Sequence, residues 1–224
     1  MIALIRYLAY FLVILFTVTT FFPIALLRPF NPVNNVNLFI YFNFLAEKLL
    51  NMKIHIEGQD LLKEYQPCIL IGNHQHNYDA FTVAKFFVYK MAIIAKFELA
   101  LIPIFGWVFA LCGNILIKRS NSKKARASMS RAQKKIIKER ISIFVFPEGH
   151  RNPSTKLLKL KKGAFYMAIN TKLPLVHFSM SNYLEHNNFN SFKRINIFVK
   201  VHSPVDTTNL DLKDIPRLID QSKN

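Results

Sequence analysis

The feature that most constrains this chain is an uncharged, mainly apolar run of 21 residues, Tyr7–Leu27. At about 1.5 Å per residue, a helix of this length crosses a hydrocarbon core of about 30 Å, so the run predicts a membrane segment. A signal peptide is the alternative, but the run exceeds a usual apolar signal core and no small-residue cleavage site follows it. Pro23 can kink the helix, and because Arg6 and Arg28 flank it, charge does not fix its orientation. A spanning helix and an interfacial hairpin both remain open.

The charge balance indicates an anionic partner. The 224 residues include 30 Lys and Arg against 13 Asp and Glu, which gives a formal charge of +17 and an isoelectric point near 10.0. This balance suits an anionic membrane surface, nucleic acid or acidic ligands. The 21 Phe residues and the mean hydropathy of +0.18 favour the membrane over nucleic acid. Cys68 and Cys112 form no disulfide framework or paired zinc spacing, so we expect two buried thiols.

The hydrophobic pattern divides the chain into three parts. Residues 1–28 form the N-terminal membrane segment, residues 29–52 hold a second apolar helix at Leu38–Met52, and residues 53–224 form one catalytic domain. In that domain short β-rich runs alternate with helical ones, which predicts an α/β fold with a mixed, largely parallel central sheet flanked by helices. The expected strands are Ile54–Ile56, Cys68–Ile71, Met91–Ala95, Ile115–Ile117, Ile141–Phe146, Leu175–Phe178 and Ile195–Val201. The expected helices are Asp79–Phe87, Glu98–Leu111, Ser122–Arg140 and Lys161–Asn170.

Two of the expected helices have unusual surfaces. Leu99–Leu111 is apolar on every side, so it is either a core helix or a segment that dips into lipid. Ser122–Arg140 carries one apolar stripe surrounded by lysines and arginines. A solvated helix face would explain this pattern, but so would a basic surface for anionic lipid headgroups or an acidic acyl donor.

The glycine spacing excludes several enzyme classes. No two of the six glycines have the separation that a nucleophile elbow, a Walker phosphate loop or a dinucleotide fingerprint needs. This argues against serine hydrolases, P-loop proteins and dinucleotide-binding enzymes.

A histidine and an aspartate follow the apolar strand that ends at Ile71. His74 and Asp79 lie five positions apart, which on one continuous helix would turn them about 140° from each other. On a strand-to-helix turn, however, His74 can fold back against Asp79 at the carboxyl end of a strand, where open α/β sheets bind ligands. A carboxylate on one imidazole nitrogen fixes the tautomer, so the other nitrogen can accept a proton from a hydroxyl. The alternative is that Asp79 only caps its helix.

Two further strand ends carry charged residues. Ile141–Phe146 is followed by a turn that contains Glu148, Gly149 and Arg151. Arginine offers a bidentate fork to phosphate, and glycine lets backbone approach a substrate. The strand at Ile115–Ile117 likewise ends in Lys118 and Arg119. Together with the histidine and aspartate, these cations predict a pocket for a phosphorylated acceptor.

These residues resemble the motifs of the glycerophospholipid acyltransferase family, and most of all those of 1-acylglycerol-3-phosphate acyltransferases. The similarity covers about residues 54–205, with every block in the family's order. The blocks are Asn73-His74-x4-Asp79, Lys96-Phe97-Glu98-Leu99, Ile102-Pro103-x2-Gly106-Trp107, Gly113-x3-Ile117-x-Arg119, Phe146-Pro147-Glu148-Gly149-x-Arg151 and Leu173-Pro174-Leu175-Val176. Lys118 and His150 depart from the pattern, because the family often has Asp and Thr there, and this leaves the acceptor preference open.

The resemblance implies a role for each site residue. It makes His74 the general base and Asp79 the residue that orients it. It also implies that Arg119 binds the acceptor phosphate and that Glu148, Gly149 and Arg151 help to form the acceptor site.

The implied reaction transfers a fatty acyl chain from an acyl thioester, either acyl-CoA or acyl carrier protein, to the sn-2 hydroxyl of 1-acylglycerol-3-phosphate. It needs no cofactor and no metal. The implied partners are membrane lipid, the lysophospholipid and the thioester donor, and the expected location is the cytoplasmic face of the inner membrane. One alternative is another lysophospholipid or amino-acid lipid as acceptor. Others are a metal-dependent enzyme that uses His74, His76 and Asp79, and a noncatalytic basic adaptor.

Overall fold

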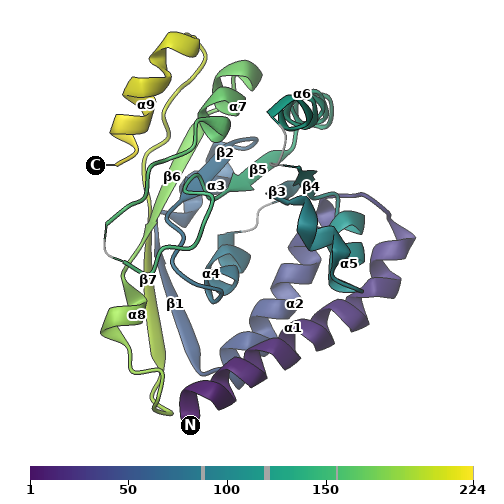
Figure 1. The fold of residues 1–224 in the computed structure, drawn as a ribbon, viewed down its shortest axis with the longest axis vertical. Helices are drawn as coiled ribbons and strands as arrows, with labels where there is room; N and C mark the ends of the chain where they lie inside the picture. The colour runs from purple at the N-terminus through teal and green to yellow at the C-terminus, as the bar shows by residue number, and fades with distance from the viewer. Residues whose placement is uncertain (87–88, 119–121, 155, 224) are drawn as a thin grey trace.

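The computed structural model describes residues 1–86, 89–118, 122–154 and 156–223, without the side chains of residues 122–126. Within these residues a central sheet lies between two layers of helices (Figure 1). The strands are β1 (Met52–Glu57), β2 (Ile69–Gly72), β3 (Met91–Lys96), β4 (Ile115–Ile117), β5 (Ser142–Val145), β6 (Leu175–Met180) and β7 (Ile195–Val201). The helices are α1 (Ile2–Leu27), α2 (Val33–Leu49), α3 (Gln59–Glu64), α4 (Asp79–Phe86), α5 (Phe105–Leu111), α6 (Ser122–Glu139), α7 (Gly163–Thr171), α8 (Tyr183–His186) and α9 (Ile215–Gln221), with short 3-10 helices η1 (Phe97–Leu101) and η2 (Leu212–Asp214).

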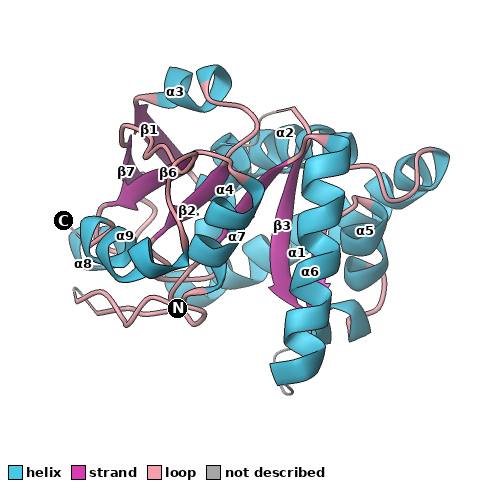
Figure 2. Ribbon diagram, turned by 90° about the horizontal axis from the view of Figure 1, so that it is seen from above, coloured by secondary structure: helices cyan, strands magenta, loops and turns pink. Residues whose placement is uncertain are grey.

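The sheet is mixed and largely parallel, as the sequence predicted. Among the described residues its seven strands lie in the order β1-β7-β6-β2-β5-β3-β4. Strands β6, β2, β5, β3 and β4 run in one direction, whereas β7 is antiparallel to β6 and β1 is parallel to β7. All seven expected strands form, and Figure 2 shows the sheet from above with helices on both sides. The carboxyl ends of β2, β5 and β6 therefore meet at one edge of the sheet.

The alternation of side chains along each strand builds two cores. On one face Leu70, Phe144 and Val176 pack in a cluster with residues of α1, α2 and α4. On the other face Ile69 and Ile143 pack in a cluster with residues of α6, α7 and α9. Strands with apolar side chains on both faces are typical of sheets that helices cover on both sides.

Helix α1 packs against the rest of the chain along its whole length. In its first half Tyr10 and Val13 are buried in the core beside α2 and α4. In its second half Val18, Phe21 and Ala25 are buried with residues of α2 and α5. The two halves therefore both lie on the protein, and Figure 1 shows α1 running beside α2.

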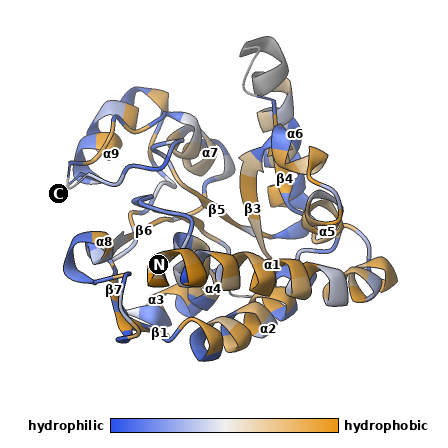
Figure 3. Ribbon diagram, turned by 60° about the horizontal axis from the view of Figure 1, so that its bottom comes forward, coloured by the Kyte–Doolittle hydropathy of each residue, from blue (hydrophilic) through white to orange (hydrophobic). Residues whose placement is uncertain are grey.

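The outward side of α1 is apolar as well. Of the described residues, Ile2–Leu27 is the one helix long and apolar enough to cross a membrane, and 33% of its most apolar window is buried. Exposed apolar side chains continue onto α2, η1 and α5. Figure 3 shows the predominantly hydrophobic composition of α1 along its length. We call this surface the apolar face; its exposed members include Leu4, Leu8, Phe11, Leu12, Leu15, Phe16, Ile40, Phe44, Leu101 and Trp107.

Several predicted boundaries were wrong. The expected helix Glu98–Leu111 is broken into η1 and α5, because Pro103 has no N–H to continue a helix and Ile104 takes a φ of 61°. The segment Leu99–Leu111 is not a core helix along its whole length, since Val108 is buried whereas Trp107 is exposed. Helix α2 begins five residues before the expected Leu38–Met52, and Met52 already belongs to β1. Helices α3, α8 and α9 were not predicted.

Other expectations from the sequence are confirmed. Cys68 and Cys112 are free and buried, and burial raises the pKa of each thiol to about 12. Helix α6 extends to Glu139, with Ala132 and Ile136 of its apolar stripe buried. The expected helix Asp79–Phe87 is present as α4, although Phe87 lies outside the described residues.

Candidate active site

The loop after β2 brings His74 against Asp79. Gly72 ends the strand, and a Cβ there would lie 2.4 Å from the Phe178 ring, so only glycine lets the two strands pack this closely. The chain then turns back on itself, and His74 Nδ1 lies 2.6 Å from Asp79 Oδ2. Because a carboxylate can only accept, Nδ1 carries the proton and donates it to this bond. The fold-back predicted from the strand-to-helix turn is confirmed.

The Asp79 carboxylate is completely buried and has four donors. Besides His74, it accepts from the backbone N–H of Gln75 at 2.6 Å and of His76 at 3.0 Å, and from the Tyr183 hydroxyl at 2.5 Å. A carboxylate offers about four lone-pair positions, so these donors fill them. The aspartate thus turns back toward the preceding loop, and the alternative that it only caps its own helix is wrong.

The imidazole of His74 is fixed on its second side by an aromatic ring. It stacks on Phe146, with centroids 3.8 Å apart and planes inclined by 6°. Its side chain keeps 21% of its exposure, so a substrate can reach it. With Nδ1 bonded to Asp79, Nε2 has a free lone pair in a set orientation. This nitrogen is able to accept a proton from a hydroxyl placed beside it.

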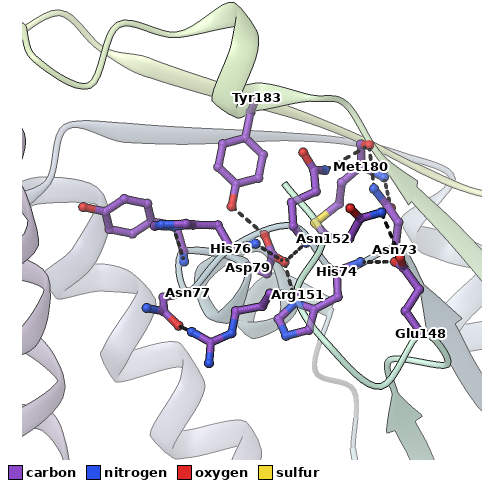
Figure 4. A network of polar contacts seen from close by, with 12 residues as sticks. Asn73, His74, His76, Asn77, Asp79, Glu148, Arg151, Asn152, Met180 and Tyr183 are labelled. Carbon is purple, nitrogen blue, oxygen red and sulfur yellow. Dashed lines mark hydrogen bonds and ion pairs between the residues drawn. The ribbon is translucent and has the colours of Figure 1, made fainter. Parts of the chain in front are cut away.

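The Glu148 side chain connects its own loop, which follows β5, to the His74 loop. Its carboxylate is 2% exposed and accepts from the His74 N–H at 2.8 Å and the Leu158 N–H at 3.1 Å, with Asn152 Nδ2 at 3.4 Å. The Asn152 N–H in turn donates to the His74 carbonyl at 2.7 Å. The glutamate therefore faces the protein, and it sets the position of His74 through the backbone (Figure 4).

Arg151 lies on the other side of the same turn. Gly149 has a φ of +77°, which favours glycine and lets the chain reverse between Glu148 and Arg151. The Arg151 side chain is exposed, and its Nη1 donates to the side-chain oxygen of Asn77 in the His74 loop (Figure 4). The structure thus brings together five of the six predicted site residues: His74, Asp79, Glu148, Gly149 and Arg151.

The sixth, Arg119, lies outside the described residues. Its neighbour Lys118 is exposed and holds its Nζ over the ring of Phe97, 4.6 Å from the centroid. His150, the second departure from the family pattern, is exposed.

A small polar pocket of about 130 Å³ adjoins the same loops. Its lining includes Asn73, Gln75, Glu148 and Asn182. A larger hollow of about 370 Å³ lies on strands β1, β6 and β7, where His55, Phe198 and Lys200 line it. None of the predicted site residues lines this second hollow.

Sequence reasoning missed the residues that reach the site from distant segments. Tyr183 comes from α8, and Asn152 comes from the loop after β5. Neither lies in a pattern that sets it apart, so no signal in one sequence could have found it.

His76, a metal ligand in one alternative, is half-buried, and this burial lowers the pKa of its imidazole.

The fold and this geometry define an α/β protein with a histidine held by a buried carboxylate at the carboxyl end of a parallel strand. A family model described as Acyltransferase matches residues 53–181. The chain is 34% identical over 184 residues to the 1-acyl-sn-glycerol-3-phosphate acyltransferase of Salmonella typhimurium, which covers 82% of this chain and 75% of that protein. It is 32% identical over 183 residues to an uncharacterized acyltransferase of Schizosaccharomyces pombe, which covers 80% of this chain and 66% of that protein.

The fold also matches a solved structure. The crystal structure of the 1-acyl-sn-glycerophosphate acyltransferase PlsC from Thermotoga maritima superimposes with a TM-score of 0.68 at 24% identity, covering 100% of this chain and 95% of that one. The chain belongs to the acyltransferase family, and it is an O-acyltransferase.

Proposed function

We propose that the protein transfers a fatty acyl group from an acyl thioester to the sn-2 hydroxyl of 1-acylglycerol-3-phosphate. The product is phosphatidic acid, a precursor in phospholipid biosynthesis. The observation that carries this proposal is the His74–Asp79 pair, in which the His74 side chain stays 21% exposed, together with the exposed Arg151, which is bonded to Asn77 of the same loop. The name of the Salmonella typhimurium relative supports the choice of acceptor.

In this reaction His74 acts as the general base. Its Nε2 takes the proton of the acceptor hydroxyl while the hydroxyl oxygen attacks the thioester carbonyl carbon. The tetrahedral intermediate then collapses, the carbon–sulfur bond breaks, and the imidazolium returns the proton to the leaving thiolate. Asp79 stabilises the imidazolium between these two steps, and because its other lone pairs are occupied it stays in place.

The acceptor phosphate lies near the cations. Arg151 is exposed at the edge of the site, and Arg119 is the second arginine that we assign to the phosphate. Glu148 contributes indirectly, since its buried carboxylate holds the His74 loop, and Gly149 allows the turn between Glu148 and Arg151. In this proposal the two arginines bind the phosphate, and the glutamate keeps the His74 loop in position.

The apolar face supports a position of the site at a lipid surface. Both halves of α1 pack on the protein, and its outward side presents apolar side chains such as Leu8 and Phe11. A helix of this kind lies in the membrane interface with its apolar side in the acyl region. We therefore propose that α1, α2 and α5 rest on the membrane and that α1 forms no separate span.

The thioester donor is acyl-CoA or acyl carrier protein, both acidic molecules that suit a chain of +17 charge. Such donors are soluble, so the active site faces the compartment that contains them. We propose the cytoplasmic face of the inner membrane.

Acyl transfer by the purified protein in vesicles tests the proposal. Each donor is combined with lysophosphatidate, with a lysophospholipid that carries a different headgroup, and with a lyso amino-acid lipid. Phosphatidate is expected as the main product with at least one donor. Acylation of another acceptor in place of lysophosphatidate would reject the acceptor but keep the acyl transfer. Loss of all activity on treatment with a chelator would instead favour the metal-dependent alternative.

A further inference from the structure

Asn77 lies in the His74 loop, where its polar groups bond to helix α1 and to Arg151. Its backbone carbonyl accepts from the Tyr10 hydroxyl of α1 at 2.6 Å. Its side-chain NH₂ donates to the Tyr7 hydroxyl, also on α1. Its side-chain oxygen accepts from Nη1 of Arg151. This residue therefore connects the helix at the apolar face directly to the arginine of the site.

The orientation of the Asn77 amide follows from its partners. Arg151 only donates, so the oxygen must face the guanidinium, and the NH₂ must then face Tyr7. The Tyr7 ring lies beside the rings of His76 and Tyr78, with a centroid distance of 6.0 Å in each case. These ring contacts hold the Tyr7 hydroxyl in position, and the hydroxyl in turn fixes the orientation of the Asn77 amide.

Helix α1 can serve as a fixed reference because a buried arginine holds its first turns. Arg6 is 6% exposed and donates to the backbone carbonyls of Leu50 at 2.6 Å, of Ser191 at 2.8 Å and of Lys193 at 2.7 Å. These carbonyls belong to two segments far apart in the sequence. The start of α1 therefore cannot shift without breaking several charge-assisted hydrogen bonds, each stronger than a neutral one.

We propose that Asn77 is a positioning residue that sets the Arg151 guanidinium for the acceptor phosphate and ties this position to the membrane-docked helix α1. The inference rests on the proposed function. A neutral amide suits this task, because it orients a guanidinium with one hydrogen bond and leaves its full charge for an anionic ligand. A carboxylate at the same position would pair with Arg151 and compete with the phosphate.

The test uses Asn77→Ala and Asn77→Asp in the full-length protein on vesicles. For each variant, KM and kcat are measured with lysophosphatidate. The inhibition constant is measured for 1-acyl-1,3-propanediol 3-phosphate, which carries the phosphate but has no hydroxyl to acylate. Asn77→Ala is expected to raise both KM and the inhibition constant by about tenfold, as for loss of one hydrogen bond to a charged group, while kcat changes less than about twofold. Asn77→Asp is expected to raise both constants at least as much.

Two further variants separate positioning from general loop structure. Tyr7→Phe removes the oxygen that holds the Asn77 amide and is expected to raise KM by about threefold, the effect of one neutral hydrogen bond. Tyr41→Phe is the matched control on α2, where the ring lies against Phe16, and it is expected to behave as wild type. If Asn77→Ala has the wild-type KM and inhibition constant, the inference is wrong. It is also wrong if Asn77→Asp has the wild-type values of both constants, because any acceptor of the Arg151 hydrogen bond would then suffice. If the wild-type protein does not acylate lysophosphatidate at all, the proposed function fails instead.

Discussion

Tyr183 donates its hydroxyl to Asp79 at 2.5 Å, and the two residues lie 104 positions apart in the sequence. The phenol is buried, and it completes the set of donors around the carboxylate. Burial and the neighbouring Asp79 charge raise the pKa of Tyr183 well above its ordinary value. The phenol therefore stays protonated throughout the physiological range, and Asp79 keeps this donor.

Tyr183→Phe should lower stability and change its dependence on pH. It removes one donor from a buried carboxylate, which costs about 1–3 kcal/mol of unfolding free energy. Because the pKa of Tyr183 is raised on folding, its contribution is complete below about pH 10, the unfolded value, and is lost as pH rises above it. The wild type should thus lose stability more steeply than Tyr183→Phe in alkaline solution. Denaturant unfolding of both proteins at pH 7 to 11 would measure this, and equal slopes would contradict it.

The apolar face should control membrane binding without controlling the fold. Phe11→Ser with Leu15→Ser changes two side chains of α1 that are 58% and 41% exposed. Inserting such a side chain into an apolar phase is worth about 1.5–3 kcal/mol, so the double variant should bind vesicles at least about tenfold more weakly. Leu212→Ser, at 51% exposure in η2, is the matched control and should bind like the wild type. Sedimentation with vesicles measures binding, and unchanged sedimentation of the double variant would show that this face does not dock.

Point changes are better than deletion of residues 1–28 for this purpose. Helix α1 contributes Tyr10, Val13, Phe21 and Ala25 to the cores. Its deletion would uncover the apolar partners of these side chains, including Phe42 of α2. The truncated protein should therefore aggregate as well as leave the membrane, and the two effects could not be separated.

Arg119→Ala should weaken the use of a phosphorylated acceptor. Loss of a charge-assisted hydrogen bond to phosphate corresponds to about 1.5–3 kcal/mol, or at least about a tenfold fall in kcat/KM. A change in KM alone would indicate uniform binding, whereas a fall in kcat as well would indicate that the contact also positions the transition state. Steady-state kinetics with lysophosphatidate measures both. If neither constant changes, Arg119 does not contact the acceptor.

The sequence predicted the strands and the turn that are determined by residues close together in the chain. Short apolar or alternating runs were sufficient to find every described strand. Strands β2 and β5 are buried throughout and therefore need apolar side chains on both faces, whereas β7 alternates between buried and exposed positions. The His74–Asp79 pair was also predictable, since both residues lie in one turn after β2. The break between η1 and α5 was missed, although Pro103 is a local signal for it.

Contacts between distant segments could not be predicted in the same way. Tyr183 reaches Asp79 only because β6 lies beside β2 in the sheet. Asn77 donates to Tyr7 and accepts from Tyr10, and both bonds depend on α1 packing beside the His74 loop. The apolar run predicted only a membrane segment. Pairings of this kind follow from the order of strands and helices in space.

The role of His74 is tested by comparing three variants of its loop. A hydroxyl is a poor nucleophile at neutral pH, and a positioned base contributes about 10²–10⁴ in rate. His74→Ala should lose kcat by this order yet keep its fold and membrane binding, because the imidazole lies at the edge of the core. Asp79→Asn should also be severe, since a neutral amide can neither stabilise the imidazolium nor enforce the same tautomer.

His76→Ala separates the base from the metal-dependent alternative. In the general-base mechanism His76 only lies beside Tyr7 and Tyr78, so its loss should reduce kcat less than about tenfold. In the metal-dependent alternative His74 and His76 are both ligands, and their substitutions should be comparably damaging. The measurement is acyl transfer at saturating donor, with folding checked by circular dichroism. If His74→Ala turns over at nearly the wild-type rate, His74 is not the base, because another group must then take the hydroxyl proton.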